Sequence, residues 1–79
     1  MWIVLCFDRL NDTQMNLAVL DNDETLLNYS NKLLSELEDA SIVMIPTNQH
    51  KIHKKIYPLI TSKHCDIYVQ WFELNQIPN

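Results

Sequence analysis

Three aspartates lie at the ends of predicted strands, where carboxylates can converge on a divalent metal ion. Asp8 follows one apolar run, Asp21 follows a second, and Asp66 stands near the start of the last. Carboxylates around such an ion are the usual machinery for cleaving phosphodiester bonds. These residues therefore allow a minimal metal-dependent nuclease, which we keep as an alternative. Turn and helix-cap roles explain the same aspartates more simply, so we predict no enzyme.

Imidazoles and thiols form a second group of candidate ligands. His50 and His53 are three residues apart, and His64 directly precedes Cys65. Their spacing matches no standard zinc pattern, so we expect neither a metal ion nor a cofactor. His64 is also poorly placed to activate Cys65 as a nucleophile, because neighbouring residues on a strand point to opposite faces. Cys6 lies within an apolar run and is predicted to be a small core residue.

Six of the ten acidic residues fall within residues 21–40, and this stretch has the clearest helical pattern in the chain. Its leucines recur at the three- and four-residue spacing of one helix face, which predicts an amphipathic helix. Asp21 and Glu24 have the spacing of a capping box, although Asn22 or Asp23 fits the cap position equally well. The leucines of this face are Leu26, Leu33 and Leu37, with Leu27 and Leu34 beside them.

The acidic residues of this helix, together with aromatic residues of the strands, are candidates for binding a partner. Acidic side chains crowd the last helical turn, where the helix dipole prefers cations, so either a basic partner or simple solvation must explain them. An acidic surface can occupy the basic nucleic-acid groove of an enzyme, because it presents a similar charge. The predicted partner-binding residues are Asp21, Asp23, Glu24, Glu36, Glu38 and Asp39, together with Trp2, Tyr68 and Phe72.

Basic side chains gather in the later part of the chain and form an alternative site, one for nucleic acid. Tyr57 is the only aromatic residue among them, which does not favour stacking with the bases of a single strand. The formal net charge of −4 also disfavours phosphate binding. We therefore expect no direct binding of nucleic acid. The residues of this alternative patch are Lys51, Lys54, Lys55 and Lys63.

The composition restricts the possibilities further. The 79 residues, of which 47% are hydrophobic, are enough for one small domain. Glycine is absent, so Gly-rich phosphate loops are excluded and positive φ angles should fall on Asn or Asp. No apolar run is long enough to span a membrane, and the start MWIVLCF lacks the basic flank and the length of a signal peptide. The two cysteines lie far apart, so we expect reduced thiols and a cytoplasmic protein, in the host cytoplasm if a virus encodes it.

The order of the predicted elements is ββαβαβ within a single domain over residues 1–79. A short polar connection between the first two strands indicates a hairpin, and Pro58 should break or kink the second helix. We therefore predict an α+β fold with a mixed four-stranded sheet and two helices. Residues 72–79 are expected to form a loose C-terminal tail. The predicted strands are residues 2–7, 15–20, 41–45 and 65–72, and the predicted helices are residues 21–40 and 49–56.

Both faces of the predicted sheet are apolar, and only two helices are available to cover them. Ile3, Leu5 and Phe7 point one way from the first strand, while Trp2 and Val4 point the other. A large exposed apolar patch is unusual on a monomer. Either one helix covers each face, or both helices cover one face and the other face meets a partner, which is a second copy of the chain in a homodimer or another protein.

The opening strand and its aspartate, the segment IVLCFD, resemble the start of small ferredoxin-like nucleases. The resemblance covers this one strand, and the glycines of those nucleases are absent from the chain. It implies a metal site that includes Asp8, which is the nuclease alternative stated above.

Small acidic single domains without catalytic motifs are a common form of inhibitors, antitoxins and immunity proteins encoded by phages and mobile elements. We therefore hypothesise that the chain is a non-enzymatic, protein-binding inhibitor. Its acidic surface would engage a basic protein or complex that processes nucleic acid, without any role at a membrane. The most specific form of this hypothesis is an anti-defence protein of the anti-CRISPR kind.

Overall fold

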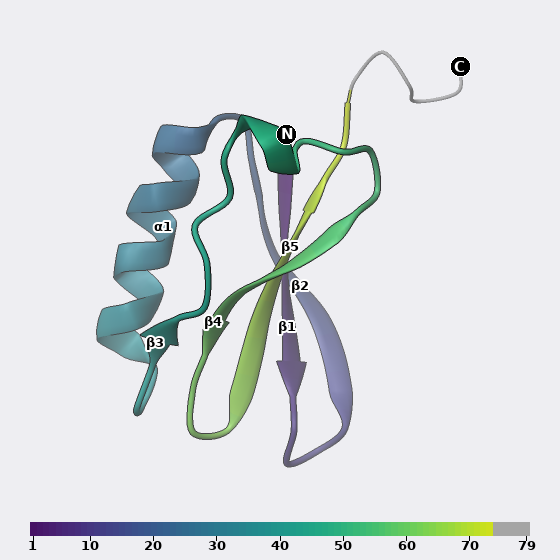
Figure 1. Cartoon of the computed structure of the whole chain (residues 1–79). Coiled ribbons are helices and arrows are strands. Elements are labelled where there is room, and N and C mark those ends of the chain that lie inside the picture. The colour runs from purple at the N-terminus through teal and green to yellow at the C-terminus, as the bar shows by residue number, and fades with distance from the viewer. Residues whose placement is uncertain (74–79) are drawn as a thin grey trace.

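The computed structural model describes residues 1–73, and these form one five-stranded sheet with one helix lying across it (Figure 1). The strand order is β2-β1-β5-β4-β3, and every neighbouring pair is antiparallel. The predicted tail lies, except for its first two residues, outside this described range. The elements are β1 (Trp2–Asp8), β2 (Thr13–Leu20), α1 (Asp23–Glu36), β3 (Ser41–Ile42), the 3₁₀ turn η1 (Asn48–His50), β4 (Ile56–Thr61) and β5 (Cys65–Trp71).

The predicted mixed four-stranded sheet with two helices in ββαβαβ order is wrong, because the sheet has five antiparallel strands and the described chain has a single α-helix. Residues 49–56, predicted as the second helix, instead form the end of η1, a loop and the first residue of β4. Lys54 has a φ of 65°, which interrupts any helix there. Pro58 holds Tyr57 in an extended conformation, so this segment joins the sheet.

The helix α1 is shorter than the predicted span of residues 21–40. Asn22 is its N-cap, and the Asn22 side chain accepts a 2.9 Å hydrogen bond from the backbone N–H of Thr25. Asn22, which the sequence allowed as an alternative to Asp21 at the cap position, is thereby confirmed as the N-cap. At the other end Leu37 donates its backbone N–H to the carbonyl oxygen of Leu33 at 2.9 Å and leaves the helical conformation. The predicted strand over residues 41–45 is likewise reduced to two residues.

The core lies between α1 and one face of the sheet. Trp2 and Val4 of β1 are fully buried there, beside Val69 of β5. A β-bulge in β4 turns two consecutive residues, Leu59 and Ile60, into the same core. The other core residues are Ile67 of β5 and Leu26 and Leu33 of α1.

The opposite side of the sheet, which we call the open face, is not covered by any helix of the described chain. It contains a shallow groove of about 330 Å³, which is lined by Leu5, Phe7, Gln14, Ile56 and Tyr68. Of the two apolar faces expected from the sequence, α1 therefore covers one, and the open face is left without a helix. Among residues 1–73, no helix is long and apolar enough to cross a membrane.

Candidate partner-binding surfaces

Three segments that are distant in the sequence meet at one end of the molecule, which we call the turn end. Lys63, in the turn between β4 and β5, donates its backbone N–H to Glu38 O at 2.9 Å and thereby holds the segment after α1. Arg9, in the turn between β1 and β2, donates its backbone N–H to His64 O at 3.0 Å. Figure 1 shows these turns together at the foot of the sheet.

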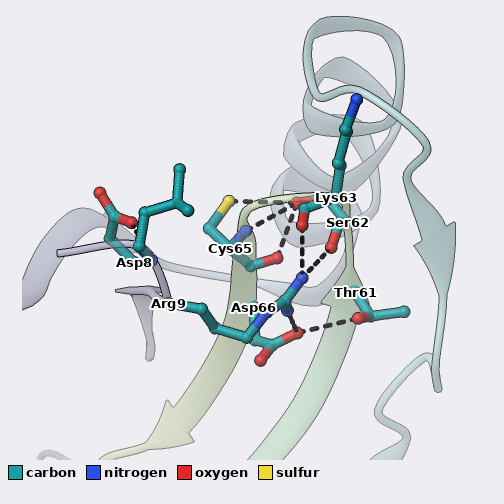
Figure 2. A network of polar contacts seen from close by, with 8 residues as sticks. Asp8, Arg9, Thr61, Ser62, Lys63, Cys65 and Asp66 are labelled. Carbon is teal, nitrogen blue, oxygen red and sulfur yellow. Dashed lines mark hydrogen bonds and ion pairs between the residues drawn. The ribbon is translucent and has the colours of Figure 1, made fainter. Parts of the chain in front are cut away.

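The guanidinium group of Arg9 ties the two strand turns together (Figure 2). It donates hydrogen bonds to Asp66 Oδ1, to Ser62 O and, at 2.8 Å, to Lys63 O. Thr61 Oγ1 donates to the same carboxylate oxygen of Asp66 at 2.8 Å. Arg9 is the main reason why the pKa of Asp66 lies below its ordinary value. The network fixes the turn end in one arrangement.

Asp8 closes the turn between β1 and β2. Its Oδ1 accepts the backbone N–H of Leu10 at 2.9 Å, and its Oδ2 accepts the side-chain amide of Asn11 at 2.9 Å. The bond from Asn11 is the largest cause of the lowered pKa of Asp8. This is the turn role that explains an aspartate at the end of a strand without any catalytic function.

The three aspartates of the nuclease alternative do not converge. Asp8 is the direct partner of Cys65 across β1 and β5, whereas Asp66 is the partner of the preceding residue of β1, Phe7. The side chains of Asp8 and Asp66 therefore project from opposite faces of the sheet. Asp21 follows β2 at the far end of the molecule. Within residues 1–73, no three His, Cys, Asp or Glu side chains are arranged to hold a metal ion.

The turn end carries most of the excess negative charge of the protein. Two basic side chains, Arg9 and Lys63, stand there against six acidic ones, and a third, Lys32, lies one helical turn before Glu36. At the opposite end, around Met1, three lysines and the N-terminal amino group face four acidic side chains. The two ends of the molecule therefore differ strongly in charge. We call the six acidic residues of the turn end the acidic pole: Asp8, Asp12, Glu36, Glu38, Asp39 and Asp66.

Some members of the acidic pole are partly neutralised and others are not. Glu38 lies 3.3 Å from Lys63 Nζ and 3.9 Å from His64 Nε2, in an exposed pair that water screens. Asp12, Glu36 and Asp39 are exposed and make no ion pair within the described chain. These three carboxylates give the pole its uncompensated charge.

The predicted partner-binding residues Trp2 and Asp23 bond to each other, and only Trp2 of the two is buried. Trp2 is fully buried, and its indole N–H donates to Asp23 Oδ1 at 3.0 Å. Lys51 Nζ lies 3.0 Å from the other oxygen of Asp23 and 5.1 Å from the centre of the Trp71 ring. The bond from Trp2 is the main cause of the lowered pKa of Asp23. The remaining predicted acidic residues, Asp21 and Glu24, stay exposed beside this cluster.

The four lysines of the alternative nucleic-acid patch are not brought together. Lys51, Lys54 and Lys55 precede β4, while Lys63 follows it, so a six-residue strand of about 20 Å separates them. Lys51 is paired with Asp23, as described above. Among residues 1–73, Lys54 and Lys55 are therefore the only exposed lysines that are neighbours.

The two predicted aromatic residues of β5 and its continuation lie in different places. Tyr68 lines the groove of the open face. Phe72 stacks edge-on against His53 at 5.5 Å between ring centres. The groove thus retains only one of the predicted aromatic residues, and its other lining residues are Leu5, Phe7, Gln14 and Ile56.

The sequence analysis missed that the two cysteines are neighbours. Cys6 and Cys65 lie on the same face of the adjacent strands β1 and β5 and line one pocket of about 270 Å³ with Met15 and His64. Both thiols are free. Burial, and after it the neighbouring Cys65, raises the pKa of Cys6 to about 11, so Cys6 is a protonated, poorly nucleophilic thiol at neutral pH. Placing the two thiols together requires the pairing register of β1 and β5, which the sequence alone did not show.

Comparisons of the chain with protein-family models, with curated proteins and with solved structures find no match. The function is therefore inferred from the surfaces themselves. Of these, the acidic pole combines the strongest charge with a framework that is held in place by the Arg9 network.

Proposed function

We propose that this protein is a non-enzymatic inhibitor whose acidic pole engages the basic surface of a protein that processes nucleic acid. The observation that carries the proposal is the concentration of six acidic side chains at the turn end against Arg9, Lys63 and, one helical turn away, Lys32. Such a field attracts basic surfaces and accelerates their association, while it repels phosphate groups. The same charge that favours a protein partner therefore disfavours nucleic acid itself.

The arrangement of the acidic pole supports the proposal as well as its charge. The pole is built from the β1–β2 turn, the β4–β5 turn and the end of α1, which the backbone bonds of Lys63 and Arg9 hold together. A framework fixed before binding loses little conformational freedom when a partner docks. Lys- and Arg-lined grooves for nucleic acid are the natural counterpart of such a surface. A phage or mobile-element anti-defence role, of the anti-CRISPR kind, is the most specific form of the proposal.

The experiment compares two double variants that remove the same number of charges from opposite ends of the molecule. Glu36→Gln with Asp39→Asn changes two members of the pole, and Asn tolerates the φ of 54° at position 39. The matched control is Asp21→Asn with Glu24→Gln. Immobilised proteins are incubated with nuclease-treated host lysate, and the bound proteins are identified by mass spectrometry. Circular dichroism verifies that each variant is folded.

We expect the wild type and the control to capture the same partner, and the pole variant to lose it. The purified partner should then release nucleic acid when wild-type protein is added, and keep it when the pole variant is added. The effect should weaken as the salt concentration rises, because screening shortens the reach of exposed charges. Equal capture by both double variants, or capture that disappears with nuclease treatment, would contradict the proposal.

A further inference from the structure

The two free thiols occupy diagonal positions on neighbouring strands. Cys6 of β1 is the direct partner of Ile67, and Cys65 of β5 is the direct partner of Asp8, two residues further along β1. Both cysteines therefore project from the same face of the sheet, where they pack against the margin of the hydrophobic core. They are only partly buried, and the pocket of about 270 Å³ that they share is also lined by the exposed side chain of Leu10. The two sulfur atoms are thus accessible from solvent through one pocket.

Met15 adds a third sulfur atom to this pocket. It is the direct partner of Cys6 across β1 and β2, so the two side chains lie opposite each other on one face of the sheet. Met15 is 60% exposed, and its side chain therefore contributes little to the core. Its thioether is, however, a soft and polarisable ligand. The three adjacent strands β2, β1 and β5 each supply one sulfur atom to the same place.

The diagonal placement of the cysteines favours an ion between the sulfur atoms over a disulfide bond. Diagonal residues of an antiparallel pair have Cα atoms about 7–8 Å apart. A separation above about 7 Å is too long for a disulfide unless the backbone moves. An ion between the two sulfur atoms replaces one S–S bond of about 2.0 Å with two metal–sulfur bonds of about 2.3 Å each. The longer bridge spans the diagonal without a change in the strand register.

The available ligands select a soft ion that needs few of them. Structural zinc sites are almost always four-coordinate, and within residues 1–73 no three His, Cys, Asp or Glu side chains are arranged to hold a metal ion. Thiolate and thioether sulfur atoms favour Cu(I), which is stable with two or three such ligands. The carboxylate of Asp8 also lines the pocket, but its two oxygens accept the turn bonds from Leu10 and Asn11. The remaining ligand set is therefore made of sulfur alone.

We propose that Cys6, Cys65 and Met15 form a binding site for one Cu(I) ion. Both thiols release their protons to water as the ion binds, so two thiolates and one neutral thioether surround the monovalent cation. The oxidation state of copper does not change. The buried hydroxyl of Ser62 lies 3.2 Å from Cys65 Sγ and fixes the position of this sulfur atom (Figure 2).

The position of the pocket at the turn end also favours a cation. The acidic pole surrounds it, and a concentration of negative charge raises the local concentration of positive ions. The ion needs no protein partner, so the site is independent of the proposed inhibitor function. Its test therefore uses the isolated protein, and the result does not depend on the capture experiment.

The experiment titrates the reduced protein with Cu(I) in the absence of oxygen, in competition with the coloured Cu(I) chelator bicinchoninate. The variants are Cys6→Ser, Cys65→Ser and Met15→Leu, each of nearly unchanged volume. Met44→Leu is the matched control, because Met44 lies between β3 and η1 and does not line the pocket. Circular dichroism verifies the fold of each variant. Copper K-edge X-ray absorption of the loaded wild type identifies the neighbouring atoms without any substitution.

We expect the wild type and Met44→Leu to take up one Cu(I) per chain with equal affinity. Each Cys→Ser variant should bind at least about 100-fold more weakly, and Met15→Leu about tenfold more weakly, because each loses a soft ligand. The absorption spectrum should show sulfur neighbours only. A wild type that takes no Cu(I) from the chelator at severalfold excess would overturn the proposal, as would a Cys→Ser variant with wild-type affinity. Wild-type affinity of Met15→Leu, or oxygen and nitrogen neighbours of the copper, would overturn the three-sulfur site.

Discussion

The indole N–H of Trp2 donates a 3.0 Å hydrogen bond to Asp23 Oδ1, which joins the first strand to the first turn of the helix. The same carboxylate pairs with Lys51 at 3.0 Å, and Lys51 in turn lies over the ring of Trp71. One side chain thereby connects the sheet, the helix and the loop before β4. Asp23, which the sequence pattern assigned to an acidic binding surface, therefore has a structural role.

Substitutions at Asp23 should separate its hydrogen bond from its charge. Asp23→Ala leaves the buried N–H of Trp2 without its acceptor, which should cost about 1–3 kcal/mol of the free energy of unfolding. Asp23→Asn keeps an oxygen acceptor and loses only the exposed pair with Lys51, which is worth less than about 1 kcal/mol. Urea unfolding gives both values, and the NMR signal of the Trp2 indole N–H reports the bond directly. Equal losses for the two variants would contradict this assignment.

The Arg9–Asp66 contact should make the stability depend on pH. The pKa of Asp66 is lowered in the folded protein, chiefly by Arg9, so its contribution is complete above the unfolded pKa and is lost as the pH falls through the folded pKa. The free energy of unfolding should therefore decrease on acidification below about pH 5. The Asp66→Asn variant should have a lower free energy of unfolding at pH 7, and this free energy should decrease less steeply as the pH falls.

The control for this pH series is Glu24→Gln, because Glu24 accepts no side-chain hydrogen bond or ion pair within the described chain. Its urea midpoint should follow the wild-type curve between pH 7 and pH 3. An Asp66→Asn variant with the full wild-type acid response would show that other carboxylates govern the acid unfolding.

Lys54 should be a site where substitution stabilises the protein. It has a φ of 65°, in the left-handed region that costs a residue with a side chain about 1–2 kcal/mol relative to glycine. Lys54→Gly should remove this cost, but glycine is also more flexible in the unfolded chain and loses more conformational freedom on folding. The net gain in the free energy of unfolding should therefore be about 0.5–1 kcal/mol. Thermal unfolding measures the gain. Lys55→Gly, at the next residue, should lower the stability, and a gain of the same size there would refute the explanation.

The thiol of Cys6 should react slowly in the folded protein. A pKa of about 11 for Cys6 lowers the thiolate fraction at pH 8 about 100-fold relative to an ordinary thiol. Iodoacetamide labelling of the wild-type protein, followed at the Cys6 peptide by mass spectrometry, should accelerate strongly in urea and as the pH rises. Cys6→Ser serves as the comparison. Equally fast labelling of Cys6 in the folded and the unfolded wild-type protein would contradict the partly buried, protonated thiol.

Local patterns predicted several elements correctly. The strands beginning at Trp2 and Cys65 and the amphipathic helix through Leu26 and Leu33 are where the periodicity placed them. The predicted hairpin of β1 with β2 is also confirmed. These features depend on residues that are neighbours in the chain, because burial on one face of a strand or helix imposes a period of two or of about 3.6 residues.

The segment around Ile56 shows where local patterns were not sufficient. Ile52 and Ile56 have the spacing of a helical face, yet Ile56 and Tyr57 pair with Gln70 and Val69 of β5. Tyr57–Pro58 and the branched isoleucines were the local signs of extended structure. The surrounding lysine and histidine residues obscured them, because they are compatible with an exposed helix face.

The sequence by itself therefore determined the composition of the surface, the absence of glycine and the main elements that form from local periodicity. Only the tertiary structure decided which charges lie together, because strand pairing carries Asp8, Asp12 and Asp66 to the same end of the molecule as Glu36, at the end of α1, and Asp39, in the segment after it. It also brought the two cysteines together on adjacent strands. Contacts between distant segments depend on which strand edges meet, and no pattern within a single segment specifies that choice.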